Sequence, residues 1–261
     1  MTPVDVHFVS DGPPGAPVLV LSPSLGSTLG MWDPQVADLA AQFRVVRYDP
    51  RAHGHSPVPP GPYEIADLAD DVVRLMDRLG VERAHYCGLS LGGMIGIALG
   101  ADHPDRVDRL VLCCTTAHFP SPAPWVERAA VVRAKGTAAV ADSVVERWLT
   151  PAFAADHPDI VARLRSMIEQ TPDEGYAACC GAIERMDLRS ALPRICAPTL
   201  VVAGEQDPST PPEFLRRIAE AIPGARLAVL SPAAHLANIE QADAMTRLVL
   251  DHLTADAAVT A

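Results

Sequence analysis

Residues 88–92 read Gly-Leu-Ser-Leu-Gly, a spacing typical of a serine that acts as a nucleophile. An apolar run at 84–87 precedes the pattern and a helix-like stretch at 93–99 follows it. A serine on a sharp turn between strand and helix has a strained backbone and an exposed hydroxyl, and the flanking glycines relieve the crowding. The same residues would also fit a glycine-rich connection with a helix-capping serine. The strand-to-helix setting favours Ser90 as the catalytic nucleophile.

A serine hydroxyl is a poor nucleophile unless a base accepts its proton and a third group orients that base. Asp207 follows the predicted strand 199–203, and His235 follows the predicted strand 226–230. The loops at the carboxyl ends of parallel strands meet in one crevice, and sites of this type run in the order serine, acid, histidine. The sequence therefore predicts that Ser90, Asp207 and His235 come together as a catalytic triad.

Other interpretations of these positions are possible from sequence alone. Glu205 is an alternative acid, two residues before Asp207. An ordinary Asx turn would also explain Asp207, and a polar loop residue would explain His235. A second position at which an acid could follow a strand holds Thr115 and Thr116, which favours the later acid.

Attack on a carbonyl also needs donors for the negative charge that develops on its oxygen. One donor should be the backbone N–H of Leu91, directly after the nucleophile. The other should come from the Ser/Gly-rich loop 22–27, which follows an early predicted strand, although an ordinary turn would have the same composition.

Short apolar runs alternate with longer helical patterns, which predicts βαβ units and a mostly parallel sheet covered on both faces. The expected strands are 4–9, 17–21, 44–49, 84–87, 107–113, 199–203 and 226–230. The expected helices are 35–43, 64–79, 91–102, 212–221 and 241–253.

One segment, 118–187, has helical patterns and no convincing strand, and it contains Trp125 and Trp148. We interpret it as a helical cap inserted into a core made of residues 1–117 and 188–261. Its position between two predicted strands places it over the carboxyl edge of the sheet.

Composition limits the class of function. The 261 residues carry a formal net charge of −11, which argues against nucleic acids and anionic membrane surfaces as partners. We expect no signal peptide and no membrane span. The six cysteines form no Cys-x-x-Cys pair and several lie in apolar runs, so we interpret them as buried hydrophobic residues rather than metal ligands. These features predict a cytoplasmic protein.

Over nearly its whole length the chain resembles the α/β-hydrolase family. The segment 48–56, Tyr-Asp-Pro-Arg-Ala-His-Gly-His-Ser, is similar to that family's Asp-x-Arg-Gly-His-Gly-x-Ser segment, with Ala52 where glycine is usual. The resemblance implies that His53 and His55 belong to the scaffold. Many relatives carry His-Gly-x-Gly in the oxyanion loop, and matching Gly26 to its second glycine implies that Leu25 supplies the second donor.

Within that family the chain resembles the 3-oxoadipate enol-lactonases. The resemblance rests on residues 21–26, 88–93, 147–153, 176–180, 207–212 and 234–241, although Pro23 stands where asparagine is usual. It implies that Ser90 attacks the carbonyl of a small enol-lactone, with His235 as base and Asp207 orienting it. Water would then release the acyl group, and the reaction needs neither a metal nor an organic cofactor.

The carboxylate of such a substrate requires a cation in this acidic chain. The cap contains Arg128, Arg133, Lys135 and Arg147. We choose Arg133 as the anchor because it lies near Trp125 on the predicted first cap helix, although a solvated arginine would look the same. Trp125 and Trp148 are expected to line the pocket or to pack the cap onto the core.

Two other functions remain open at this point. The same triad would serve another small-molecule carboxylesterase or a cofactor-free perhydrolase-like enzyme. A ligand-binding protein could also retain the hydrolase fold without turnover. The sequence makes no prediction about oligomeric state.

Overall fold

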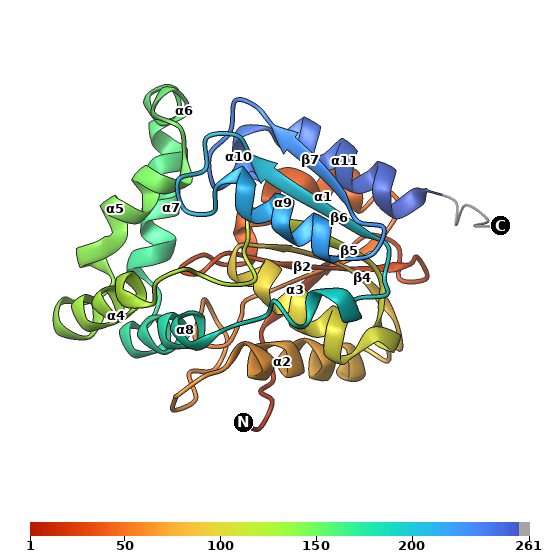
Figure 1. The fold of residues 1–261 in the computed structure, drawn as a ribbon, viewed down its shortest axis with the longest axis horizontal. Helices are drawn as coiled ribbons and strands as arrows, with labels where there is room; N and C mark the ends of the chain where they lie inside the picture. The colour runs from red at the N-terminus through yellow and green to blue at the C-terminus, as the bar shows by residue number, and fades with distance from the viewer. Residues whose placement is uncertain (256–261) are drawn as a thin grey trace.

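The computed structural model describes residues 1–255 and has a seven-stranded sheet at its centre (Figure 1). The strand order is β1-β3-β2-β4-β5-β6-β7, and only β1 runs antiparallel to its neighbour. The strands are β1 Phe8–Asp11, β2 Val18–Ser22, β3 Arg44–Tyr48, β4 Ala84–Leu89, β5 Val107–Cys113, β6 Thr199–Gly204 and β7 Arg226–Leu230. The predicted mostly parallel sheet is confirmed.

The first strand begins later than the expected range 4–9. Two side chains accept amide hydrogens that strand pairing would otherwise use. The amide of Val4 donates to Asp71 Oδ1 at 2.7 Å, and the amide of His7 donates to Ser56 Oγ at 2.8 Å. Regular pairing with β3 starts only at Phe8, opposite Tyr48.

Helices cover both faces of the sheet, as continuous apolar strands require. In Figure 1, α2 (Ile65–Arg78) and α3 (Leu91–Asp102) lie against one face, and α1 (Asp33–Leu39) and α11 (Ala242–Thr254) lie against the other. The remaining α-helices of the core are α9 (Pro212–Ala221), which was expected, and the short α10 (Ala237–Glu240), which was not. The helix α1 starts before the expected residue 35 because Pro34 occupies its first turn, where proline is favoured.

Five α-helices and no strand lie between β5 and β6, and we refer to residues 118–187 as the helical insertion. They are α4 (Ala123–Lys135), α5 (Ala138–Trp148), α6 (Pro151–Asp156), α7 (Pro158–Glu169) and α8 (Asp173–Arg185). In Figure 1 these helices form a group at one end of the molecule, and α4 packs along α8. Within residues 1–255, no helix combines the length and apolar character that crossing a membrane requires.

The helical insertion is joined to the loop of His235 by a set of hydrogen bonds. The amide of Leu236 donates to the carbonyl of Trp148 at 2.8 Å. The carboxylate of Glu240 accepts from the amide of Ala234 at 2.9 Å, and from the amide and hydroxyl of Thr150 at 3.0 and 2.7 Å. The position of the insertion is therefore coupled directly to the segment that carries the histidine.

Candidate active site

Ser90 occupies the sharp turn between β4 and α3 that the sequence predicts. Its backbone angles are φ 57° and ψ −113°, a conformation that costs energy for any residue with a side chain. A Cβ at Gly88 would lie 2.1 Å from the carbonyl oxygen of Gly92, and a Cβ at Gly92 would lie 2.3 Å from that of Ser22. Both positions therefore require glycine. The turn places Ser90 in the wall of a cavity.

Neighbouring strands hold the turn in place. The amide of Ser90 donates to the carbonyl of Cys113 at 2.9 Å, and Thr115 Oγ1 donates to the carbonyl of Ser90 at 2.7 Å. Thr115 thus supports the turn from the position where a catalytic acid could have followed β5.

The structure brings Asp207 and His235 into direct contact after β6 and β7. Asp207 Oδ2 lies 2.7 Å from His235 Nδ1 and accepts from Thr210 Oγ1 at 2.6 Å. Asp207 Oδ1 accepts from the amides of Ser209 and Thr210 at 2.7 and 3.0 Å. Both oxygens of the buried carboxylate are thereby satisfied.

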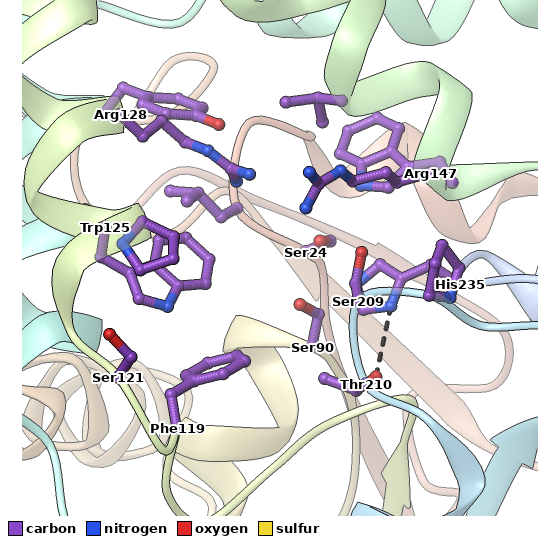
Figure 2. A pocket seen from close by; sticks show the side chains of 16 residues that line it. Ser24, Ser90, Phe119, Ser121, Trp125, Arg128, Arg147, Ser209, Thr210 and His235 are labelled. Atoms are coloured by element: carbon purple, nitrogen blue, oxygen red, sulfur yellow. Dashed lines mark hydrogen bonds between the residues drawn. The ribbon is translucent and has the colours of Figure 1, made fainter.

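This environment keeps Asp207 ionised. Burial by itself raises the pKa of a carboxyl group, but the interactions with His235 and with the donors on Thr210 outweigh it, so the pKa of Asp207 is lowered. An ionised Asp207 accepts a hydrogen bond from Nδ1–H of His235, so Nε2 is the ring nitrogen that can accept a proton. Figure 2 shows Ser90 and His235 at the same cavity, together with the contact between Thr210 and His235.

The alternative acid, Glu205, has a different environment. It accepts a hydrogen bond from Ser231 Oγ, and its side chain is exposed rather than part of the cavity wall. Of the two acids weighed from sequence, Asp207 is the one that contacts the histidine.

The loop that carries Leu25 lies beside the start of α3. The amide of Gly92 donates to the carbonyl of Pro23 at 3.1 Å, which joins the loop to the serine turn. Within residues 1–255, no acceptor takes up the amides of Leu25 and Leu91. Two free N–H groups near Ser90 are what an oxyanion hole requires.

His53 forms a hydrogen bond with this loop and does not line the cavity. Its Nε2 accepts from the amide of Gly26 at 2.9 Å, and its Nδ1 donates to the carbonyl of Arg51 at 3.1 Å. Burial lowers the pKa of His53, so the ring is neutral, as this donor and acceptor pattern requires. His55 is exposed.

The cavity at Ser90 has a volume of about 200 Å³, enough for a small molecule. Its walls come from the sheet loops and from the helical insertion, and both Trp125 and Trp148 line it. In the described part of the chain, no three His, Cys, Asp or Glu side chains gather in a way that could hold a metal ion.

The choice of Arg133 as substrate anchor is wrong. Arg133 forms a two-pronged ion pair with Glu174, at 2.9 and 2.8 Å, and lines a separate surface hollow. Arg128 and Arg147 line the cavity instead. Arg128 and Arg133 are five residues apart on one helix, about 140° around its axis, so only one of them can face the cavity.

Arg128 was the arginine that helical spacing could have identified, because it lies one turn after Trp125. Its guanidinium carbon is 4.8 Å from the centre of the Trp125 ring. In Figure 2 the guanidinium groups of Arg128 and Arg147 point toward each other across the cavity. No ion pair joins either guanidinium to a carboxylate that the structure describes, and Arg128 lies beside the hydroxyl of Tyr176, while Arg147 is also exposed to solvent. The cavity therefore presents two positive charges without a carboxylate partner.

The fold and this site define the class of protein. Residues 17–242 match the model of the α/β hydrolase fold family, and the chain belongs to that family. It is 38% identical to 3-oxoadipate enol-lactonase 2 of Acinetobacter baylyi, over 94% of this chain and 92% of that protein. It is 31% identical to a putative carbamate hydrolase RutD of Stutzerimonas stutzeri, over 92% of each chain.

Among solved structures, the fold is similar to that of the enol-lactonase from Burkholderia xenovorans. The TM-score is 0.94 and the identity is 48%, over 95% of this chain and 96% of that one. Similarity at this level supports hydrolase activity for the chain.

Proposed function

We propose that this protein is a serine hydrolase that opens the enol-lactone of 3-oxoadipate through an acyl-enzyme on Ser90. One observation carries the proposal: a single cavity combines Ser90, the paired His235 and two uncompensated arginines. The enol-lactonase names of similar proteins support the same substrate class.

The first half of the reaction uses the serine and the oxyanion donors. Ser90 Oγ attacks the lactone carbonyl carbon, and His235 Nε2 takes the hydroxyl proton. Asp207 stabilises the resulting imidazolium through Nδ1. The amides of Leu25 and Leu91 donate to the oxygen that becomes negative in the tetrahedral intermediate.

Collapse of that intermediate breaks the bond between the carbonyl carbon and the ring oxygen. The ring oxygen leaves as an enolate, which takes a proton and becomes a ketone on the same molecule. The acyl group stays on Ser90 until a water molecule, deprotonated by His235, attacks it. His235 passes the proton of Ser90 to the leaving enolate and later passes the proton of the water molecule back to Ser90. The products are 3-oxoadipate and free enzyme.

Arg128 and Arg147 supply the positive charge that binds the substrate carboxylate, replacing the role expected of Arg133. A local positive site is needed because the chain as a whole carries a net charge of −11. Trp125 and Trp148 form apolar walls. The partner in this proposal is a small-molecule lactone, and a cytoplasmic location remains a prediction from the cysteine content.

The test is turnover of 3-oxoadipate enol-lactone by the purified protein and by its Ser90→Ala variant. We expect hydrolysis by the wild type and a loss of at least about 10⁴-fold in kcat for the variant. Undiminished turnover by Ser90→Ala would refute the acyl-enzyme. Preference for a carbamate or a simple aryl ester would assign a different hydrolase activity. Labelling of Ser90 by a fluorophosphonate without turnover of any substrate would point to a ligand-binding protein.

A further inference from the structure

Tyr176 presents a buried hydroxyl whose hydrogen is accepted by no group that the structure describes. The residue belongs to α8, lines the cavity at Ser90 and has no exposed surface. Its Oη has no hydrogen-bond partner among the described residues. Native proteins seldom leave a buried hydroxyl unpaired, and such a group in a cavity wall is free to donate to a ligand or to water.

The charged group beside this hydroxyl, Arg128, cannot accept its hydrogen. Burial raises the pKa of Tyr176 well above its usual value, with a smaller opposing effect from the neighbouring Arg128. The phenol therefore stays protonated and can donate. Arg128 is also purely a donor, and so is Arg147 across the cavity. The two guanidinium groups and this hydroxyl thus supply donors to the cavity without a carboxylate partner, which is complementary to a carboxylate ligand.

The aromatic ring of Tyr176 has a separate role. A Cβ at Gly26, where φ is +78°, would lie 2.8 Å from Cε2 of Tyr176. The ring therefore packs directly on Gly26, the residue that follows Leu25, and His53 Nε2 accepts a hydrogen bond from the amide of the same residue. Replacing the ring would disturb the oxyanion loop, whereas removing only the hydroxyl would not.

We infer that Tyr176 Oη donates a hydrogen bond to the carboxylate of the substrate and forms, with Arg128, one carboxylate subsite opposite Ser90. This inference rests on the proposed function and adds a residue that determines specificity. The subsite accepts the charged arm of a small acid or lactone and rejects neutral esters only by leaving its donors unpaired. A simple dicarboxylate such as adipate carries the same chemistry and should bind there.

Tyr176→Phe tests the hydroxyl alone, because phenylalanine keeps the ring against Gly26. With the enol-lactone as substrate, we expect KM to rise about tenfold and kcat to change by less than about twofold. The kinetics with p-nitrophenyl acetate, which carries no carboxylate, should stay the same. An unchanged KM for the lactone would overturn the inference. Equal losses on both substrates would overturn it as well, since they would show a structural role.

Adipate binding, measured by titration calorimetry, tests the subsite without relying on catalysis. We expect Tyr176→Phe to weaken adipate about tenfold. Tyr63→Phe is the matched control, because the Tyr63 hydroxyl donates to the carbonyl of Pro59 outside the cavity. This variant should bind adipate with the same affinity as the wild type. The Tyr176→Phe/Arg128→Met double variant should lose less than the sum of the single losses, since both residues bind one carboxylate.

The two proposals can fail separately. If wild-type protein binds adipate through Tyr176 but does not hydrolyse the enol-lactone, the subsite stands and the proposed function falls. If the lactone is hydrolysed but the wild type and Tyr176→Phe bind adipate equally, the function stands and the subsite falls. No detectable adipate binding by the wild type would also overturn the subsite.

Discussion

Two polar clusters border the cavity at Ser90 and differ in how their hydrogen bonds are completed. In the core cluster, both oxygens of Asp207 are occupied by His235, Ser209 and Thr210. In the helical insertion, the hydrogen of the Tyr176 hydroxyl has no acceptor, and neither Arg128 nor Arg147 has a carboxylate partner among the described residues. The core cluster is complete before a ligand arrives, whereas the insertion cluster is complete only with an anion present.

This difference separates chemistry from selection. A preorganised cluster can stabilise charge in the transition state of any substrate, because nothing in it must rearrange. An incomplete cluster favours ligands that carry the missing acceptor. Variants of the core cluster should therefore impair all substrates, and variants of the insertion should impair only those with a carboxylate.

Asp207→Asn gives the largest effect among the variants that separate the two clusters. The amide cannot hold His235 in the tautomer that leaves Nε2 free, so we expect kcat to fall by about 10⁴-fold. Steady-state kinetics should show the same loss with the enol-lactone and with p-nitrophenyl acetate.

Glu205→Gln is the matched control, because Glu205 contacts Ser231 instead of the histidine, and it should retain nearly full activity. A loss confined to the lactone in Asp207→Asn would contradict the division between the clusters.

Arg147→Met should have an intermediate effect, limited to anionic substrates. Removing one charged partner of a carboxylate should raise KM for the enol-lactone about 10- to 100-fold and leave neutral-ester kinetics unchanged. Methionine keeps much of the apolar length of the arginine beside Trp148.

Arg133→Met provides the comparison, since Arg133 is paired with Glu174 outside the cavity. Similar KM values for both arginine variants would show that position in the cavity does not matter, and the assignment of Arg147 would then be wrong.

Glu240→Gln should produce the smallest effect, and it tests how the two clusters are held together. The amide nitrogen of glutamine cannot accept from Thr150 as a carboxylate oxygen does. Loss of that bond should lower the free energy of unfolding by about 1–2 kcal/mol and reduce kcat a few-fold. Chemical denaturation and kinetics would measure the two effects.

Glu174→Gln is a useful control, because the pair formed by Glu174 and Arg133 is exposed and should contribute little to stability. If Glu240→Gln changed stability without any change in kcat, the link between the insertion and the His235 loop would have no part in activity.

Much of the core site could be predicted because it depends on local signals. Gly88 and Gly92 mark a turn that side chains would block, and Asp207 and His235 each follow an apolar strand. Parallel strands bring such loops to one edge, so strand order along the chain sufficed to predict that an acid after β6 and a histidine after β7 lie near Ser90. The shifted start of β1 was not predictable, because side chains distant in sequence accept the amides of residues 4 and 7.

The walls of the cavity were harder to predict. The sequence identified cationic and aromatic residues in 118–187. Nearness to Trp125 along the chain does not distinguish Arg128 from Arg133, so it could not show that Arg128 is the one that faces the cavity. Glu174, forty-one residues away from Arg133, pairs with it on the outer side of α4. Tyr176 lies in one of the segments, 176–180, that resemble the enol-lactonases. Nothing in the sequence indicated that its hydroxyl hydrogen would lack an acceptor.

Local sequence was enough to predict the strand-to-helix turn at Ser90, the order of serine, acid and histidine, and the interruption of the sheet by helices. These features follow from local backbone geometry and from the rule that parallel strands end at a common edge. Three outcomes depended on packing between distant segments: the acid that contacts His235, the arginines that face the cavity, and the contact between Tyr176 and Gly26. Those outcomes depend on how helices rotate and pack across long sequence separations, and such contacts leave no periodic signal in the chain.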